Sequence, residues 1–233
     1  MMNFDKWYPI YKEIINDFSF SEEEDYNAAS ILDYLLESKS YHVTQHELST
    51  IIKNKAIVIF GAGPSLEHCL DTYQTIIQNN VLISADGATS ALLKRNIIPD
   101  IIVTDLDGAV DDQILANQKG SIMIVHAHGD NIKNIKTFLP KISKKLCGSI
   151  QTDPRSFSHV YNFGGFTDGD RSVFLAAHFE AKEIYLMGFD FLGPVGSYSL
   201  PSQKNTKIKL KKLLRAKKLI DLLSYDLHIQ ILH

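Results

Sequence analysis

Residues 56–66 read AIVIFGAGPSL, and this stretch indicates the fold class. An apolar run enters a glycine-rich turn and a predicted helix begins near Leu66, which is typical of a buried parallel strand followed by a helix. The pattern recurs, because short apolar runs end in Gly, Asp or Pro and alternate with amphipathic stretches. We therefore expect an α/β fold with a doubly wound, mostly parallel, Rossmann-like sheet. The expected strands are residues 56–60, 81–85, 101–104, 121–125, 145–151, 159–163, 183–187 and 228–232.

The chain before these strands has a helical pattern. Its apolar residues at helical spacing are Trp7, Ile10, Tyr11, Ile14 and Ile15. The acidic run at residues 22–25 is expected to mark a break before a second helix at residues 28–36. We predict an N-terminal helical cap over residues 1–53 and an α/β catalytic domain over residues 54–233.

The C-terminal part combines a predicted loop with a basic helix. Residues 193–205 are rich in Gly, Pro and Ser without apolar periodicity, so we expect a mobile loop. Residues 207–223 form an amphipathic pattern. We expect Leu213, Leu214, Ile220 and Leu223 to be buried, and Lys211, Arg215 and Lys218 to share one face. That face is either solvated or part of a lid that neutralises a triphosphate.

The composition limits the function classes. With 233 residues, 45% of them hydrophobic, the chain can bury one sizeable core. A formal net charge of −3 gives no reason to expect a nucleic-acid or membrane partner, because both are bound largely through excess Lys and Arg. Cys69 and Cys147 lack a CxxC spacing, so no disulfide framework is expected and a reducing cytoplasm fits. The sequence predicts no signal peptide or membrane span, and it leaves open a homo-oligomer.

Carboxylates follow two successive predicted strands. The segment PDIIVTDLDG at residues 99–108 runs from four apolar or β-branched residues into Asp105 and Asp107. Asp86, next to Gly87, follows the strand before. Whether the strand continues through Asp107 or turns at Leu106, both acids flank one rim, and a divalent cation would relieve their repulsion. Oxygen ligands favour magnesium or manganese over zinc. The alternative is that one acid caps a helix and the other is solvated.

A glycine turn after the first strand predicts an anion site. Gly61 and Gly63 precede a predicted helix, so free backbone N–H groups and the helix dipole would face a phosphate there. Pro64 would begin the helix while removing one donor. A purely structural tight turn is the alternative.

The segment HAHGDN at residues 126–131 superficially resembles the HxHxDH signature of metallo-β-lactamase-like hydrolases. Asn131 stands where that signature needs its last histidine, and a zinc site would leave the Asp105/Asp107 pair unexplained. We therefore expect Asp130 and His128 to face the same ligand as the earlier acids.

Two later segments add acids to the same rim. In residues 162–171, Thr167 or Asp168 is a credible helix N-cap, whereas the glycine pair and the further acids have no such explanation. Asp190 follows the seventh strand and is either a ligand or a cap.

Taken in order, seven segments resemble the archaeal-type 6-hydroxymethyl-7,8-dihydropterin pyrophosphokinases, whose catalytic domain is similar to that of thiamin pyrophosphokinase. They are WYPIY at 7–11 with Asp25 and the pair Ala28 and Ala29, GAGPSL at 61–66, SADGA at 84–88, PDIIVTDLDG at 99–108, HAHGDN at 126–131, GGFTDGDR at 164–171 and GFDF at 188–191. The resemblance implies magnesium-dependent transfer of a diphosphate from ATP to the hydroxymethyl group of a reduced pterin, with release of AMP. The pathway implied is the synthesis of tetrahydromethanopterin or a folate-like cofactor.

The resemblance also implies roles for individual residues. Metal and Mg-ATP would be held by Asp86, Asp105 and Asp107. The nucleotide and the substrate rim would involve Gly61, Gly63, Pro64, Ser65, Gly87, Asp130, Asn131, Thr167, Asp168 and Asp170. Arg171 would stabilise charge on the transferring group, with a salt bridge to a neighbouring acid as the alternative. His128 is a candidate proton acceptor. The pterin ring needs an apolar slot with amide-type partners, for which Phe166, Asn131 and Phe163 are candidates.

Three alternatives remain at this point. A nucleotide-sugar-dependent glycosyltransferase is one, because some surface-protein glycosylation proteins share the GPS and DG elements, although those proteins are usually much longer. A pyrophosphokinase acting on another hydroxymethyl heterocycle, such as thiamin, would differ only in the ring pocket. In an NAD-binding module, Asp86 would bind the ribose hydroxyls.

Overall fold

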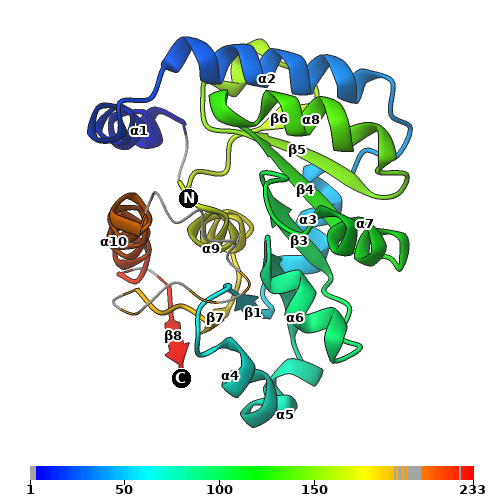
Figure 1. The fold of residues 1–233 in the computed structure, drawn as a ribbon, viewed down its shortest axis with the longest axis vertical. Helices are drawn as coiled ribbons and strands as arrows, with labels where there is room; N and C mark the ends of the chain where they lie inside the picture. The colour runs from blue at the N-terminus through cyan, green and yellow to red at the C-terminus, as the bar shows by residue number, and fades with distance from the viewer. Residues whose placement is uncertain (1–3, 192, 194–195, 197, 199–205, 226) are drawn as a thin grey trace.

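A computed structural model describes residues 4–191, 193, 196, 198, 206–225 and 227–233. Within these residues, eight strands form one sheet in which every hydrogen-bonded pair is parallel (Figure 1). The strands are β1 (Ala56–Phe60), β2 (Val81–Ala85), β3 (Ile101–Thr104), β4 (Ile122–Ala127), β5 (Leu146–Ile150), β6 (Val160–Tyr161), β7 (Glu183–Met187) and β8 (Ile229–Leu232). Their order is β6-β5-β4-β3-β2-β1-β7-β8. The predicted doubly wound fold and its eight strands are confirmed.

Helices cover both faces of the sheet (Figure 1). They are α1 (Phe4–Phe18), α2 (Glu22–Glu37), α3 (Gln45–Ile52), α4 (Leu66–Thr72), α5 (Gln74–Gln78), α6 (Ala88–Lys94), α7 (Val110–Gln118), α8 (Ile132–Phe138), α9 (Asp168–His178) and α10 (Thr206–Leu223). Ile57 and Ile59 of β1 pack toward α3, α9 and α10, whereas Val58 and Phe60 pack toward α4 and α6. This alternation explains why the strand is apolar at every position.

Strand β6 is shorter than the predicted run at 159–163. Asn162 ends the strand because its side chain forms local hydrogen bonds in place of a sheet ladder. Its Nδ2 donates to the Thr152 carbonyl at 2.8 Å, and its Oδ1 accepts from Gly164 N at 2.9 Å. The chain therefore leaves the sheet edge here and crosses back toward the centre, where α9 packs across β1, β2 and β3.

The N-terminal helices pack directly on the sheet and its helices. α2 covers β4 and β5, and α3 packs in the same core as α9. α1 packs on α9 through Trp7 and Phe174, whose rings are 5.6 Å apart, and Leu219 of α10 belongs to the same cluster. The division at residue 53 stays a prediction. The expected break at residues 22–25 is wrong, because these acids form the first turn of α2 after the N-cap Ser21. Acidic residues are stabilised there by the helix dipole.

Helix α10 buries the predicted face only in part. Ile220 is buried as expected, Leu213 and Leu223 are half-buried, and Leu214 is exposed. Ala216 and Leu219 are buried as well. Arg215 is also buried, because its guanidinium pairs with Glu13 and Asp17 of α1. Most of the predicted loop at 193–205 lies outside the described residues. None of the described helices is long and apolar enough to cross a membrane.

Candidate functional site

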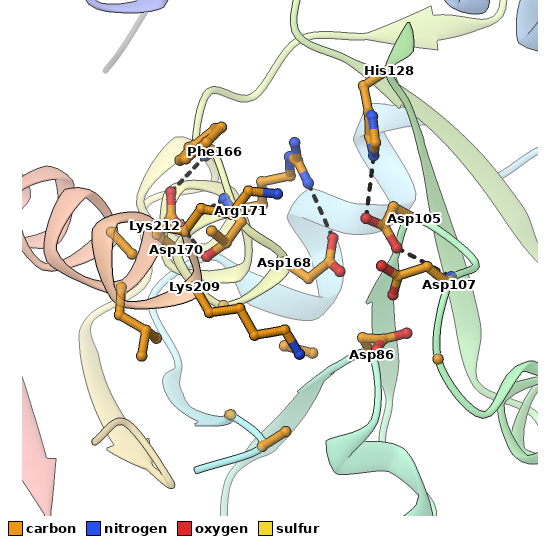
Figure 2. Close-up of a pocket in the computed structure, with 18 of the residues that line it drawn as sticks. Asp86, Asp105, Asp107, His128, Phe166, Asp168, Asp170, Arg171, Lys209 and Lys212 are labelled. Carbon is orange, nitrogen blue, oxygen red and sulfur yellow. Dashed lines mark hydrogen bonds and ion pairs between the residues drawn. The ribbon is translucent and has the colours of Figure 1, made fainter. Parts of the chain in front are cut away.

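A pocket of about 390 Å³ opens at the carboxyl ends of β1, β2, β3, β4 and β7 (Figure 2). This is the edge where parallel α/β sheets bind ligands. Twelve of the predicted site residues line it: Gly61, Gly63, Asp86, Gly87, Asp105, Asp107, His128, Asp130, Thr167, Asp168, Asp170 and Arg171. Pro64, Ser65 and Asn131 are not among the lining residues.

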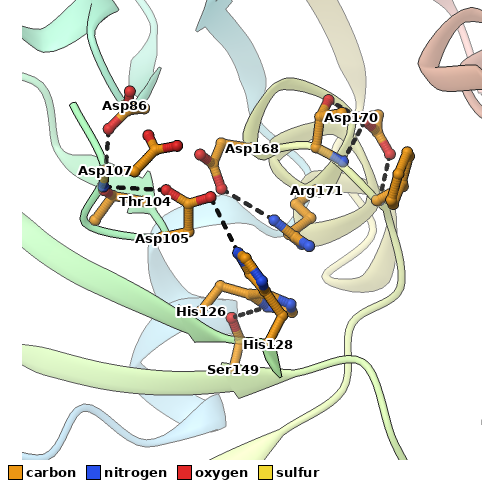
Figure 3. Close-up of polar contacts among 12 residues, drawn as sticks. Asp86, Thr104, Asp105, Asp107, His126, His128, Ser149, Asp168, Asp170 and Arg171 are labelled. Atoms are coloured by element: carbon orange, nitrogen blue, oxygen red, sulfur yellow. Dashed lines mark hydrogen bonds and ion pairs between the residues drawn. The ribbon is translucent and has the colours of Figure 1, made fainter. Parts of the chain in front are cut away.

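Three carboxylates meet at the centre of this pocket. Asp86, Asp105 and Asp168 each offer an oxygen, and these oxygens lie within 4.8 Å of one another. The three residues follow β2, follow β3 and begin α9, so the sheet and the α9 crossover bring them together (Figure 3). Three oxygen donors at this spacing suit a hard divalent cation such as magnesium.

The neighbours of Asp86 fix its carboxylate. Gln113 Nε2 donates to Asp86 Oδ1 at 2.7 Å, and Thr104 Oγ1 donates to the same oxygen at 3.2 Å. Gly108 has to be glycine, because a Cβ there would lie 2.6 Å from Asp86 Oδ1. Gln113 and Thr104 therefore hold the Asp86 carboxylate in one orientation, and neither of them carries a positive charge.

The chain turns at Leu106, the second of the two geometries considered for the Asp105/Asp107 pair. β3 ends at Thr104, and Leu106 has a φ of 65° with its N–H donating to Thr104 Oγ1 at 2.9 Å. Asp105 thus points into the group of three acids, whereas Asp107 stays exposed beside it. The third member of that group is Asp168, whereas the sequence suggested Asp107.

The acids have very different proton affinities. Burial would raise the pKa of Asp105, but the hydrogen bond from His128 and the charges of His128 and Arg171 hold it at about 2. Burial and then the charge of Asp105 raise the pKa of Asp86 and of Asp168. Asp107 as a whole is exposed, but it lines the pocket, where partial desolvation of its carboxyl group and then the charge of Asp105 raise its pKa to about 7. A divalent cation would compensate the repulsion that these shifts reflect.

Asp107→Asn is expected to make the metal-free protein lose less stability as the pH rises. The pKa of Asp107 is about 7 in the folded state against 3.8 ordinarily, so the folded state binds the extra proton between these values. The free energy of unfolding therefore decreases as the pH rises through this range. Urea unfolding in EDTA at about pH 5 and about pH 8 should show a smaller decrease in the variant than in the wild type. An equal decrease in both proteins would contradict the shift.

His128 and Asn131 act together at the end of β4. His128 Nε2 lies 3.2 Å from Asp105 Oδ2. Asn131 is buried, donates to the carbonyls of Asp105 at 2.8 Å and His126 at 2.7 Å, and accepts from His128 N at 3.0 Å. Asn131 therefore supports the loop and does not line the pocket, and its contact with a ligand stays a prediction. His126 is buried against Ser149 and does not line the pocket. The first histidine of the HxHxDH-like segment therefore lies away from the acids, which argues against a metallo-β-lactamase-like zinc site.

Arg171 forms the salt bridge that was the alternative to its catalytic role. Its Nη1 donates to Asp168 Oδ1 at 3.1 Å, its Nη2 donates to Gln151 Oε1 at 3.2 Å, and it is 6% exposed. Gln151 in turn donates to Asp25 Oδ2 at 2.6 Å. A continuous hydrogen-bonded chain thus joins the group of three acids to helix α2.

Asp25 and Gln151 are pocket residues that the sequence did not reveal as such. Asp25 is 3% exposed and also accepts from Tyr11 Oη and from Gly129 N, both at 2.8 Å. One signal was available but was missed with the helix boundary, since Asp25 lies three and four residues before Ala28 and Ala29 and so shares their apolar helix face.

Asp170 is a helix cap, which corrects its expected place among the ligands. Its Oδ2 accepts from Phe166 N at 2.6 Å, its Oδ1 accepts from Thr167 N at 2.8 Å, and the Thr167 hydroxyl donates to it as well. Thr167 and Asp170 form the capping box of α9. Both oxygens of Asp170 are therefore engaged by the backbone.

The glycine turn does not present the free N–H groups that were predicted. Gly61 N donates to the Met187 carbonyl and Gly63 N donates to the Gly188 carbonyl, both at 2.9 Å. Ser65 N donates to Asp190 Oδ2 at 3.0 Å, so Asp190 caps this turn. A Cβ on Gly63 would lie 2.5 Å from the Gly188 carbonyl oxygen. Close packing between the β1 and β7 loops explains these glycines.

Helix α10 contributes cations that differ from the predicted ones. Lys209 and Lys212 line the pocket, and the Lys209 side chain extends toward Asp86 (Figure 2). Lys212 Nζ lies 5.8 Å from the ring centroids of both Phe20 and Phe166. Lys211 instead donates to the Asp17 carbonyl of α1. Of the aromatic residues suggested for the ring, Phe166 lines the pocket, whereas Phe163 is buried against Phe179.

Comparison with known proteins gives consistent matches. The profile of the family described as 6-hydroxymethylpterin diphosphokinase MptE-like matches residues 30–193. The 6-hydroxymethyl-7,8-dihydropterin pyrophosphokinase of Methanocaldococcus jannaschii is 43% identical, over 99% of this chain and 100% of that protein. The protein of the same name from Pyrococcus furiosus is 44% identical, over 94% of each.

One solved structure shares the fold. The MAf glycosyltransferase from Magnetospirillum magneticum AMB-1 matches with a TM-score of 0.51 at 13% identity. The match covers 79% of this chain and 36% of that chain. At this identity the likeness concerns the fold alone.

Proposed function

The chain belongs to the 6-hydroxymethylpterin diphosphokinase MptE-like family, and on that basis we propose that it transfers a diphosphate from ATP to 6-hydroxymethyl-7,8-dihydropterin. The hydroxymethyl oxygen would attack the β-phosphorus, the bond between that phosphorus and the α–β bridging oxygen would break, and AMP would leave. The group of three acids, Asp86, Asp105 and Asp168, is the observation that supports this proposal most. The product would serve the synthesis of tetrahydromethanopterin or a folate-like cofactor.

The three acids would hold magnesium, which would neutralise phosphate charge during transfer. The protein itself then has to position the hydroxymethyl group in line with the breaking bond. His128 lines the pocket beside Asp105 and is our candidate to take the hydroxyl proton. Arg171 keeps Asp168 in place through their ion pair, which assigns it a positioning role.

Acceptor choice tests the proposal. With ATP and magnesium, 6-hydroxymethyl-7,8-dihydropterin is expected to give AMP at a kcat/KM at least about a hundredfold above that for thiamin, because unpaired ring donors and acceptors penalise the wrong heterocycle. If thiamin is turned over and the pterin is not, the protein is a pyrophosphokinase for another hydroxymethyl heterocycle. Release of a nucleoside diphosphate from a nucleotide sugar, without AMP from ATP, would instead indicate a glycosyltransferase.

The pocket lysines give a prediction about ATP. Lys209 and Lys212 line the pocket beside several carboxylates, so they can offset the charge of a bound triphosphate. The double variant Lys209→Ala/Lys212→Ala is expected to raise KM for ATP about tenfold, with a larger effect at low salt. Lys211→Ala is the matched control, since Lys211 contacts α1. Equal KM values in the double variant and the control would contradict a role for the pocket lysines.

A further inference from the structure

The pocket has two chemically different ends on either side of the three acids. Strand order places β4 and β5 on one side of β2 and β3, and β1 and β7 on the other. The β4–β5 end is lined by Phe20, Asp25, Gly129, Gln151 and Phe166. The β1–β7 end is lined by Gly61, Gly63, Gly188, Phe189 and Phe191. A donor and an acceptor that react over the acids therefore have to occupy opposite ends.

The β4–β5 end contains a buried carboxylate in a fixed orientation. Asp25 accepts from Tyr11, Gln151 and Gly129, and a carboxylate has about four acceptor positions, so about one remains. Gln151 adds amide hydrogen-bonding capacity beside it. The pterin edge carries two adjacent N–H donors, the 2-amino and N3–H groups. One can donate to the remaining position of Asp25 and the other to Gln151 Oε1, which accepts one bond from Arg171 Nη2 and has a second lone pair. The corresponding edge of adenine pairs one donor with one acceptor, which a carboxylate does not match.

Aromatic side chains line the pocket beside the first turn of α2, because Phe20 directly precedes Ser21, the N-cap of the helix that carries Asp25. The rings of Phe20 and Phe166 have centroids 6.3 Å apart, and both line the pocket. Flat heterocycles pack favourably against such rings. Phe18 completes the cluster, with its ring 5.7 Å from Phe20 and 4.8 Å from Phe166, but it does not line the pocket.

The acid at the β1–β7 end, Asp190, differs from Asp25 because it is only half-buried and caps the turn after β1. Its Oδ2 accepts both the amide and the hydroxyl of Ser65. The remaining walls are glycine backbone and the rings of Phe189 and Phe191, whose centroids are 5.7 Å apart. A purine base is uncharged, so backbone groups and aromatic rings can bind it without a charged side chain.

We infer that the pterin ring binds at the β4–β5 end, with its donor edge on Asp25 and its face against Phe20, and that the adenosine of ATP binds at the β1–β7 end. This inference rests on the proposed function. It makes Asp25, Phe20 and Phe191 specificity-determining residues, each for a different substrate. It also explains why the N-terminal helices belong to the site, since α2 carries Asp25.

Titration calorimetry separates the two ends. The ligands are 6-hydroxymethyl-7,8-dihydropterin and magnesium α,β-methylene-ATP, which cannot transfer the diphosphate. Phe20→Leu is expected to weaken pterin binding about fivefold and to leave the ATP analogue unchanged, because a ring contact is worth about 1 kcal/mol beyond its area. Phe191→Leu is expected to do the reverse. Phe18→Leu, in the same aromatic cluster as Phe20, is the control and should change neither affinity by more than about twofold.

Asp25→Asn tests the donor edge. Its amide would present N–H groups to the N–H groups of the pterin, so pterin binding should weaken by at least about tenfold while the ATP analogue binds normally. Thermal unfolding of each variant reports whether the pocket is still folded.

Reversed or equal effects of Phe20→Leu and Phe191→Leu would overturn the inference, as would a wild-type protein that does not bind the pterin. A wild-type protein that binds both ligands but forms no AMP when ATP replaces the analogue would overturn the proposed function and leave the binding arrangement standing.

Discussion

Asp168→Asn is expected to lower kcat/KM for diphosphate transfer about a thousandfold, which corresponds to about 4 kcal/mol of transition-state stabilisation. Asp168 supplies one of the three oxygens that lie within 4.8 Å of one another, so its loss leaves two anionic ligands for the metal. The Asn side chain still accepts a hydrogen bond from Arg171, so the fold should be retained. Steady-state rates at increasing magnesium concentration are the measurement, and the variant should need much more magnesium.

Asp111→Asn is the matched control for this substitution. Asp111 is exposed in the first turn of α7 and does not line the pocket, so its replacement should leave the rate unchanged. Wild-type turnover of Asp168→Asn at low magnesium would remove Asp168 from the metal site. Asp107→Asn should have a smaller effect than Asp168→Asn, because Asp107 lies outside the group of three acids.

Arg171→Met is expected to destabilise the protein by about 3 kcal/mol and to reduce activity as well. Removing the guanidinium leaves the Asp168 carboxylate buried without its partner, and it takes the donor away from Gln151 Oε1. Urea unfolding of the variant measures the stability change. The double variant Arg171→Met/Asp168→Asn should recover part of the stability and none of the activity, since the unpaired charge is gone but the metal ligand is missing.

The surface pair Arg155–Asp153 is a control for the buried pair. The side chain of Arg155 is 70% exposed, so Arg155→Met should leave the free energy of unfolding nearly unchanged. Equal stability of Arg171→Met and the wild type would show that the Arg171–Asp168 pair does not hold the pocket together.

The sequence predicted the sheet well because strands and their ends are local features. Each buried strand is an apolar run, and Asp86 and Asp105 follow their strands directly, so both acids could be placed at one rim. The place of Asp168 could not be predicted in this way. It depends on the crossover from the edge strand β6 back to the centre, where α9 packs across β1, β2 and β3.

Other mistakes came from contacts between distant segments. A helical pattern in α10 shows that Arg215 and Lys211 lie on its surface, but not that this surface meets Glu13 and Asp17 of α1. Likewise, the glycine turn after β1 shows where N–H groups are, but the β7 loop supplies the carbonyls that bind them.

Asp170 illustrates a local signal that could have been used. Thr167 followed three residues later by an acid is the spacing of a capping box, which predicts a structural role for that acid. Asp25 is a mixed case, since its place on the inner face of α2 follows from local spacing, but only the fold brings α2 to Gln151 and Gly129.

Phosphorus-31 NMR of the complete reaction tests the central claim most directly. With ATP, magnesium and 6-hydroxymethyl-7,8-dihydropterin, the spectrum should show AMP and a pterin diphosphate in equal amounts, and EDTA should abolish both. A spectrum that contains ADP with a pterin monophosphate, or unchanged ATP with folded, magnesium-loaded protein, would contradict diphosphate transfer at the group of three acids.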